Sequence, residues 1–291
     1  MIEQRKNGYY RVSGSKETFT VDIDRAQRGI GRYCDELLLN AVEIYDKKET
    51  KNIYCMYSGG IDSELVMEVF LHLGITIIPV IVELDPNFNN HDLSWAKAFC
   101  NKHNIEPLIF KINIQQFIES GEILNLAKLT ETYAYQYLSS IKAALSLDGT
   151  VITGQDEPTI QLDADTGNWV FSERERWCAW AKLYDRGVLK GTSCFLSWSA
   201  ETLLSFLLEP SVKQAYNNKL PNVTNTFPLR RYVYGYMFPM KIRPKYTGWE
   251  NVDNHPLLLH PTMKEVANLQ NTFNGKFDIE CKRLIQQMTF N

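Results

Sequence analysis

The sequence predicts an α/β fold in which an open parallel sheet is flanked by helices and followed by a mostly helical C-terminal extension. Between residues 50 and 155, short apolar runs alternate with segments of helical periodicity, and this alternation is typical of right-handed β–α–β crossovers. A chain of 291 residues is also long enough to bury a full hydrophobic core, as one large domain or two small ones.

The composition argues against a basic nucleic-acid-binding protein and against a disulfide-rich or metal-rich one. The chain is 44% hydrophobic and 22% charged, with a net charge of -3, so no overall basic field attracts nucleic acid. Its cysteines form no C-x-x-C pair, which predicts buried thiols rather than a disulfide or metal framework. Because the sequence shows neither an apolar N-terminal segment nor a run of about 18 apolar residues, we expect a cytoplasmic protein without a membrane partner.

The N-terminal unit, residues 1–50, is expected to hold a hairpin and a helix. Two short apolar runs within residues 8–22 are joined by a polar, glycine-containing stretch, which predicts a small hairpin. Apolar residues then recur at helical spacing through residues 25–46, which predicts an amphipathic helix.

The central unit, residues 51–160, carries the clearest strand pattern. Its first strand is expected at residues 53–57, directly before a glycine pair and a segment with helical spacing. Pro79 lies awkwardly in the second strand, because proline cannot donate a hydrogen bond to the ladder. Further strands are expected at 75–82, 107–112 and 150–154, with helices around 92–103 and over most of 115–147.

The C-terminal unit, residues 161–291, is expected to be mostly helical and to form the substrate region. Residues 226–250 break the helical pattern, because aromatic, proline and basic residues follow one another there without a clear period. Helices are expected at 173–186, 199–217, 262–273 and 278–288.

A glycine-containing loop, residues 58–63, follows the first strand of the central unit and reads Ser-Gly-Gly-Ile-Asp-Ser. Parallel sheets bind ligands at the carboxyl ends of their strands, where this loop is expected. Gly59 and Gly60 permit positive φ and let backbone N–H groups approach a ligand. Ser58 and Ser63 add hydroxyl donors, and the next helix adds its positive N-terminal end. The loop therefore predicts a binding site for phosphate groups.

Asp62 is the unexpected residue in such a loop, because a carboxylate repels phosphate. It fits if a divalent cation bridges the acid and the phosphate oxygens, and Mg²⁺ commonly combines one or two carboxylates with phosphates. The simpler alternative is a glycine turn with an acid near the start of a helix. The full Ser-Gly-Gly-x-Asp-Ser pattern, placed after an apolar strand, favours the nucleotide site.

This pattern resembles the pyrophosphate-binding loop of the PP-loop ATP pyrophosphatases, an adenine nucleotide alpha hydrolase-like superfamily that includes asparagine, NAD and GMP synthetases. It is not a Walker A loop, because the G-K-[ST] ending is absent. The resemblance covers roughly residues 30–160 and implies a HUP/Rossmann-like fold with ATP and Mg²⁺ as cofactors. The ATP contacts that it implies are Ser58, Gly59, Gly60, Ile61, Asp62 and Ser63, with Val82 and Leu84 beside the adenine.

A second segment supports the resemblance. Residues 153–158 read Thr-Gly-Gln-Asp-Glu-Pro after the fourth strand, and they resemble a G-x-x-D-E segment of asparagine-synthetase-like domains, although the spacing is shorter than usual. The resemblance implies that Gly154 contacts the nucleotide, that Asp156 joins Asp62 as a Mg²⁺ ligand, and that Glu157 acts as an acid–base group. The alternative is a turn with solvated acids.

The basic residues of segment 226–250 leave three interpretations open. Lys245 and Arg243 could neutralise the charge that builds on leaving pyrophosphate, which would make them catalytic. Aromatic and basic residues side by side could instead bind single-stranded nucleic acid, although the acidic net charge disfavours this. The third interpretation is an irregular segment that packs its aromatic side chains and solvates its charges.

The resemblance implies an ATP-dependent, AMP-forming ligase. A carboxylate or amide oxygen of a small-molecule substrate attacks the α-phosphorus, pyrophosphate leaves, and a nitrogen nucleophile then displaces AMP. Position 2 holds Ile2 rather than the cysteine of an asparagine synthetase glutaminase domain, so a separate amidotransferase or ammonia source is expected. Two rivals are a nucleic-acid base modification enzyme of the same class and a non-catalytic nucleotide-binding protein.

Overall fold

A five-stranded parallel sheet forms the centre of the protein, with strand order β5-β4-β3-β6-β9. The structure is a computed structural model that describes residues 9–12, 19–155, 157–217, 219–220, 222–235, 238, 240, 243, 246–253 and 255–289. The predicted α/β fold is confirmed. In order across the sheet, the strands are Leu108–Asn113, Ile78–Asp85, Ile53–Met56, Thr150–Thr153 and Lys190–Thr192.

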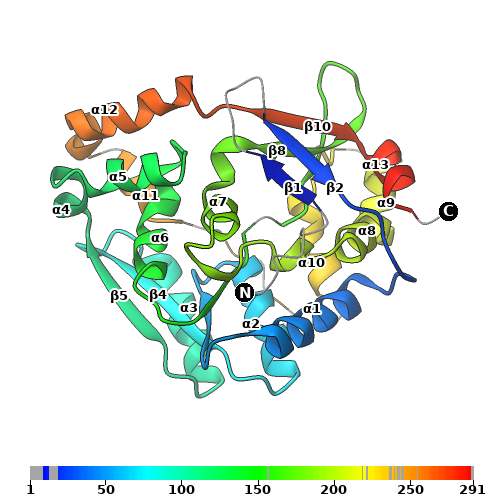
Figure 1. The fold of residues 1–291 in the computed structure, drawn as a ribbon, viewed down its shortest axis with the longest axis horizontal. Helices are drawn as coiled ribbons and strands as arrows, with labels where there is room; N and C mark the ends of the chain where they lie inside the picture. The colour runs from blue at the N-terminus through cyan, green and yellow to red at the C-terminus, as the bar shows by residue number, and fades with distance from the viewer. Residues whose placement is uncertain are drawn as a thin grey trace.

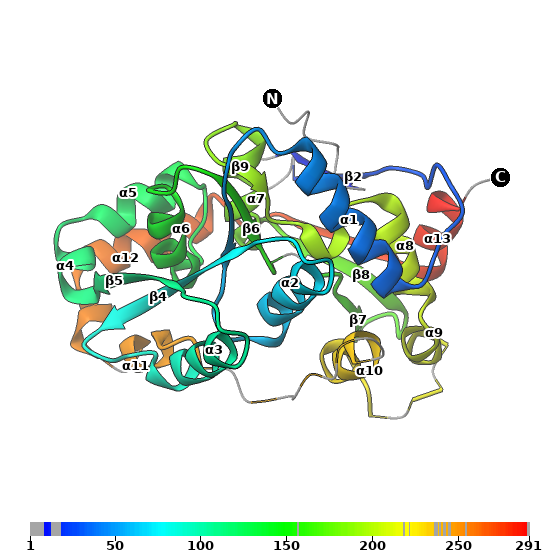
Figure 2. The ribbon, with the colours of Figure 1, turned by 90° about the horizontal axis from the view of Figure 1, so that it is seen from below.

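Helices cover both faces of this sheet. Side chains of successive strand residues point to opposite faces, and those on each face pack against a different group of helices. Cys55 belongs to one hydrophobic core with α1, α2 and α8, whereas its neighbour Met56 belongs to a second core with α5, α6 and α12. The two groups of helices lie on opposite sides of the sheet in both ribbon views (Figure 1, Figure 2). The six helices are Tyr33–Lys47, Ile61–His72, Ala200–Leu208, Glu122–Leu129, Leu138–Ala144 and Pro261–Asn268.

The N-terminal unit has the predicted hairpin, formed by the antiparallel strands β1 (Tyr9–Val12) and β2 (Thr20–Ile23). The predicted helix begins later than expected, at Tyr33 rather than at residue 25. Upstream of it, the carboxylate of Glu36 accepts a hydrogen bond from the Gly31 N–H at 2.7 Å. The guanidinium of Arg28 pairs with the same carboxylate. These contacts hold the chain in an extended entry to the helix.

Pro79 fits inside β4 because of the position at which β5 begins. The Tyr57 N–H donates to the Val80 carbonyl at 2.8 Å, so Val80 directs its backbone groups toward β3 and Pro79 faces the opposite edge. On that edge, pairing with β5 starts only at Val80 opposite Leu108. The missing N–H of Pro79 therefore costs no ladder hydrogen bond. The strand itself runs later than predicted, to Asp85 rather than to residue 82.

Helices occupy the remainder of the central unit in shorter pieces than the pattern predicted. The first is α3 (Asn90–Lys102), which follows β4. The helical stretch expected over 115–147 is divided, because Gly121 adopts a φ of 77° and separates α4 (Ile114–Glu119) from α5.

The C-terminal unit is mostly helical, as predicted, but it also contains a three-stranded antiparallel sheet of order β10-β8-β7. The strands are Lys276–Glu280, Trp169–Arg174 and Ile160–Leu162. Two predicted helices therefore start too early: α7 spans Ala179–Asp185 and α13 spans Cys281–Met288. The remaining helices are α9 (Pro210–Tyr216), α10 (Arg230–Tyr234) and α11 (Trp249–Asp253).

The cysteines of the chain are all buried and free, which agrees with the prediction of reduced core thiols. Among the described residues, no helix combines the length and the apolar character that crossing a bilayer requires.

Candidate functional site

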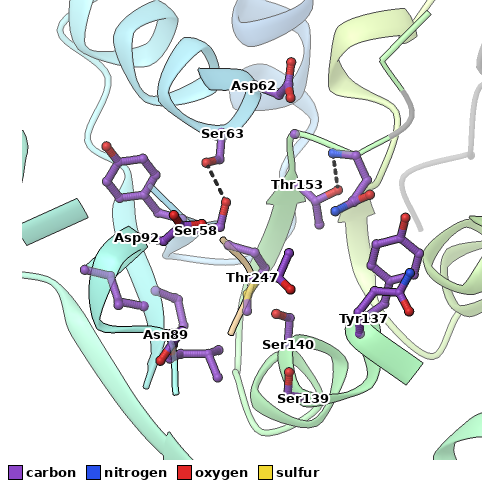
Figure 3. Close-up of a pocket in the computed structure, with 18 of the residues that line it drawn as sticks. Ser58, Asp62, Ser63, Asn89, Asp92, Tyr137, Ser139, Ser140, Thr153 and Thr247 are labelled. Atoms are coloured by element: carbon purple, nitrogen blue, oxygen red, sulfur yellow. Dashed lines mark hydrogen bonds between the residues drawn. The ribbon is translucent and has the colours of Figure 1, made fainter. Parts of the chain in front are cut away.

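A cavity of about 330 Å³ opens at the carboxyl ends of β3, β4 and β6, which is the edge where parallel sheets bind ligands. Its size falls within the range typical of small-molecule sites. The loop 58–63 reaches it from β3, and the segment after β6 reaches it from the neighbouring strand (Figure 3). The predicted residues that line it are Ser58, Asp62, Ser63, Val82, Leu84, Gly154 and Glu157.

Only the first glycine of the loop needs to be glycine for conformational reasons. Gly59 has a φ of 78°, and a Cβ atom there would lie 2.5 Å from the Asp92 carbonyl oxygen. Gly60 has φ -79° and ψ 158°, which any residue adopts. Gly154 is needed for close packing, because its Cβ would lie 2.7 Å from the Ser63 nitrogen. The end of β6 thus packs directly on the loop backbone.

The hydroxyl groups of the loop are directed into its own interior. The Ser58 Oγ accepts from the Gly60 N–H at 3.3 Å and lies 3.3 Å from the Ser63 Oγ (Figure 3). Ser63 in turn donates to the Gly60 carbonyl at 3.0 Å. Helix α2 starts at Ile61 without a side-chain cap hydrogen bond, so its first-turn N–H groups can meet an anion.

Arg230 brings the two acids of the site together. Its Nη1 lies 3.0 Å from the Asp62 Oδ2, and its Nη2 pairs with the Glu157 carboxylate. The Tyr234 hydroxyl donates to the other oxygen of Asp62 at 3.0 Å. The face of the Arg230 guanidinium lies 3.8 Å from the centroid of the Phe227 ring, a cation–π contact. Asp62 therefore has a partner for each carboxylate oxygen.

Electrostatics favour this arrangement. Burial opposes the positive charge of Arg230, whose side chain is only 5% exposed, but Glu157 and Asp62 outweigh that effect and raise the pKa of the guanidinium. Burial, together with the charge of Asp62, raises the pKa of the Tyr234 hydroxyl well above its ordinary value. Arg230 remains a cation and Tyr234 a neutral donor throughout the physiological pH range.

The metal site that the sequence predicted can be tested against these contacts. Asp156, the second expected ligand, lies outside the described residues. Asp62 uses one oxygen for Arg230 and the other for Tyr234, and a Mg²⁺ ligand would have to give up one of these contacts. Over the described parts of the chain, His, Cys, Asp and Glu side chains form no cluster of three or more suited to a metal ion. Asp62 as a Mg²⁺ ligand therefore stays a prediction, in which the ion would replace Arg230 or Tyr234 at one carboxylate oxygen.

Arg243 lies behind the loop rather than among the residues that line the cavity. Its Nε donates to the Gly59 carbonyl at 2.9 Å, and its guanidinium also pairs with Glu64. The Trp95 ring lies beside it, with the centroid 5.2 Å from the guanidinium carbon. This geometry suits a residue that fixes the conformation of the loop. Lys245, the other predicted cation, lies outside the described residues.

The side of the cavity that faces the loop is polar and uncharged. Tyr137, Ser139 and Ser140 come from the start of α6, and Thr247 comes from the segment before α11 (Figure 3). Asn89 lies at the end of β4, where its amide hydrogen-bonds the backbone of Val82 and Leu84.

Sequence reasoning missed several residues of the site: Arg230 as the partner of both acids, Tyr234, Asn89, Asp92 and the serines of α6. Arg230 had a sequence signal, because it belongs to the basic and aromatic segment 226–250. That signal also suggested a nucleic-acid contact, but the residue is 4% exposed and cannot present its charge to a docking partner. The other residues carry no motif, since isolated hydroxyl and amide groups occur throughout soluble proteins.

Comparisons with known proteins give matches to solved structures alone, because no protein-family model and no curated protein matches this chain. The chain is similar to the NH3-dependent NAD synthetase from Campylobacter jejuni subsp. jejuni NCTC 11168 in complex with the nitrate ion. That match has 16% sequence identity and a TM-score of 0.32, and it covers 83% of this chain and 91% of the other. The structure of NMN synthetase from Francisella tularensis matches at 12% identity and a TM-score of 0.31, over 74% of this chain and 98% of the other. At these TM-scores neither similarity assigns a function.

Proposed function

We propose that this protein is an ATP-dependent, AMP-forming ligase of the PP-loop class, acting on a small-molecule carboxylate or amide. The observation that carries the proposal is the loop 58–63, which opens into a cavity at the carboxyl edge of a parallel sheet with Gly59 in the left-handed region. A loop of this kind, followed by an uncapped helix, suits a triphosphate. The asparagine-synthetase-like form, with nitrogen from ammonia or a separate amidotransferase, is part of the same proposal.

The loop binds the β- and γ-phosphates in the proposed reaction. Its backbone N–H groups donate to phosphate oxygens, and on binding the Ser58 and Ser63 hydroxyls exchange their contacts within the loop for phosphate oxygens. Arg230 lines the cavity beside them, where it offsets the negative charge of Asp62 and Glu157. Arg243 keeps the Gly59 carbonyl turned away from the phosphates. The nucleotide enters as its Mg²⁺ complex, in which the phosphate oxygens hold the ion as part of the substrate.

The chemistry then proceeds in two steps. A substrate oxygen attacks the α-phosphorus, forming a new P–O bond while the bond to the bridging oxygen breaks and pyrophosphate leaves. A nitrogen nucleophile next attacks the activated carbon and AMP departs with the oxygen. Positioning of the reactants and stabilisation of the negative charge on pyrophosphate supply most of the rate in such a site.

Pyrophosphate exchange tests this proposal. The first step is reversible, so labelled pyrophosphate should appear in ATP when the correct acid is present, even without the nitrogen donor. A panel of carboxylic acids and amides, assayed with α-labelled ATP and ammonium, should give AMP from the same substrate. Asp62→Asn should lower both signals. Steady release of ADP would contradict the proposal, and ATP binding without exchange across the panel would favour a non-catalytic nucleotide-binding protein.

A further inference from the structure

β4 extends beyond its neighbour β3 on the edge that borders the cavity. β3 ends at Met56 opposite Val80, whereas β4 continues to Asp85. Backbone groups of alternate residues face the same edge of a strand, so Val82 and Leu84 direct theirs to the side that β3 has left. Both residues line the cavity. The strand therefore presents a carbonyl acceptor and an N–H donor, two residues apart, at this end of the site.

The side chain of Asn89 satisfies both groups. Its Nδ2 donates to the Val82 carbonyl at 2.8 Å, and its Oδ1 accepts from the Leu84 N–H at 2.9 Å. Only one orientation of the amide makes both contacts, because the donor and the acceptor on the strand are distinct. Asn89 thus takes the place of the missing strand.

Asn89 is also the N-cap residue of α3, yet its side chain makes no cap hydrogen bond to that helix. Asparagine is favoured at this position because its side-chain oxygen accepts from a first-turn N–H group. The neighbouring strand provides the contrast: Asn113, the last residue of β5, accepts from the Gln116 N–H at 2.8 Å and caps α4. Asn113 has the extended backbone that a side-chain cap requires (φ -74°, ψ 109°), whereas Asn89 has φ -115° and ψ 27°. The side chain of Asn89 therefore contacts the strand rather than the helix.

We propose that Asn89 is a specificity-determining residue whose amide is displaced from β4 by a 6-aminopurine base. This inference rests on the proposed function, because it concerns the base of the same nucleotide. A 6-aminopurine carries an N–H donor next to a ring-nitrogen acceptor, which is the pair that the amide now presents to Val82 and Leu84. A 6-oxopurine carries an acceptor next to an N–H donor, the reverse order, and cannot match the strand.

The packing around Asn89 favours a change of side-chain rotamer over a movement of the backbone. A Cβ atom on Gly248 would lie 2.7 Å from the Asn89 Cβ, so the segment before α11 packs directly on this residue. Asn251 also donates to the Phe88 carbonyl at 2.7 Å.

Binding of ATP and ITP by isothermal titration calorimetry tests this inference. Asn89→Ala removes both contacts to β4, so the strand edge opens. We expect ATP to bind about fivefold more tightly, the worth of roughly one net hydrogen bond, with no gain for ITP. Asn89→Asp keeps the size of the side chain and can still accept from the Leu84 N–H, so it frees only the Val82 carbonyl and the expected gain in ATP affinity is smaller.

Asn113→Ala is the matched control, because it makes the same change at the end of β5, in a residue that does not line the cavity. Its affinities for ATP and ITP should equal those of the unmodified protein. If the Asn89 variants lower the affinities for ATP and ITP equally, or leave the ratio of these affinities unchanged, Asn89 does not determine specificity. That result would contradict the inference but not the proposed function. If the unmodified protein and its variants bind neither nucleotide, the proposed function falls and the inference falls with it.

Discussion

The two strand-to-helix junctions that open into the cavity, β3–α2 and β4–α3, satisfy their polar groups from different parts of the chain. At β3–α2, charged and hydroxyl groups from the C-terminal unit contact the loop: Arg230 and Tyr234 bind Asp62, and Arg243 binds Gly59. At β4–α3, Asn89 closes the strand edge from only five residues beyond Leu84.

We relate this difference to the two parts of the nucleotide that the proposed site would bind, the phosphates at β3–α2 and the base at β4–α3. The phosphate end depends on residues far apart in sequence, so its charge balance requires the whole fold. The base end is closed locally by a neutral amide, which a ligand with the same hydrogen-bonding groups can replace. Substitutions at Arg230, Tyr234 and Arg243 should therefore affect the binding of every nucleotide, whereas substitutions at Asn89 should affect the choice of base.

Removal of the buried cation should have the largest effect. Arg230→Ala leaves the carboxylates of Asp62 and Glu157 close together without their shared partner, and breaking a buried ion pair in this way costs about 3 kcal/mol. Urea unfolding should show this loss, and binding of ATP should become undetectable. Arg32→Ala, in an exposed pair with Asp35, is the control and should cost under about 1 kcal/mol. Equal costs for the two variants would contradict the central role of Arg230.

The two glycines of the loop should respond unequally to alanine. Gly59→Ala places a side chain in the left-handed region and against the Asp92 carbonyl, so we expect a loss of about 2 kcal/mol in unfolding free energy. Gly60→Ala fits its extended backbone, so it avoids this backbone strain and should cost less than Gly59→Ala. Thermal unfolding followed by circular dichroism compares the pair, and a larger loss for Gly60→Ala would refute the loop conformation described above.

Replacement of Arg243 tests whether the β3–α2 junction can be changed without an effect on the β4–α3 junction. Arg243→Lys keeps the charge but loses the planar fork that contacts Gly59 and Glu64 together, so we expect about 1 kcal/mol less stability. Affinities for ATP and ITP, measured by calorimetry, should fall by the same factor because the base end is untouched. A change in their ratio would show that the two junctions are coupled.

The smallest effect is expected from a hydroxyl inside the loop. Ser63→Ala removes the hydrogen bond to the Gly60 carbonyl and should cost about 1 kcal/mol in urea unfolding. Ser146→Ala controls for the loss of a hydroxyl, because it removes a part-buried hydroxyl that bonds the Ala143 carbonyl just after the end of α6, outside the residues that line the cavity. ATP affinity should fall only in the Ser63 variant.

Local patterns were sufficient to predict the loop and four of the five strands of the central sheet, but not the short strand β9. The strand at residues 53–57 and the glycine pair after it lie within a few residues of one another, so composition and spacing indicate both. The strand β8 was missed because the run after it, around Trp177 and Trp180, has helical spacing. Its pairing with β10 joins Arg174 to Lys276, and no local pattern indicates such a distant partner.

The charged part of the candidate site was beyond sequence reasoning for the same physical reason. Asp62 was identified from its motif, but its partner Arg230 is 168 residues away. A carboxylate beside a phosphate loop indicates that some cation is needed, and the usual chemistry of such loops favours a metal ion. Only the fold brings the guanidinium of Arg230 to that carboxylate.

Arg243 contacts the loop but lies far from it in the sequence, and this has a consequence for folding during synthesis. The guanidinium that holds the Gly59 carbonyl lies 184 residues downstream of it, and the N-terminal part of a chain generally folds first as the polypeptide leaves the ribosome. The sheet can therefore assemble while the loop still lacks its restraint. Nascent chains stalled ahead of residue 230 should leave the loop open to proteases that the finished protein resists.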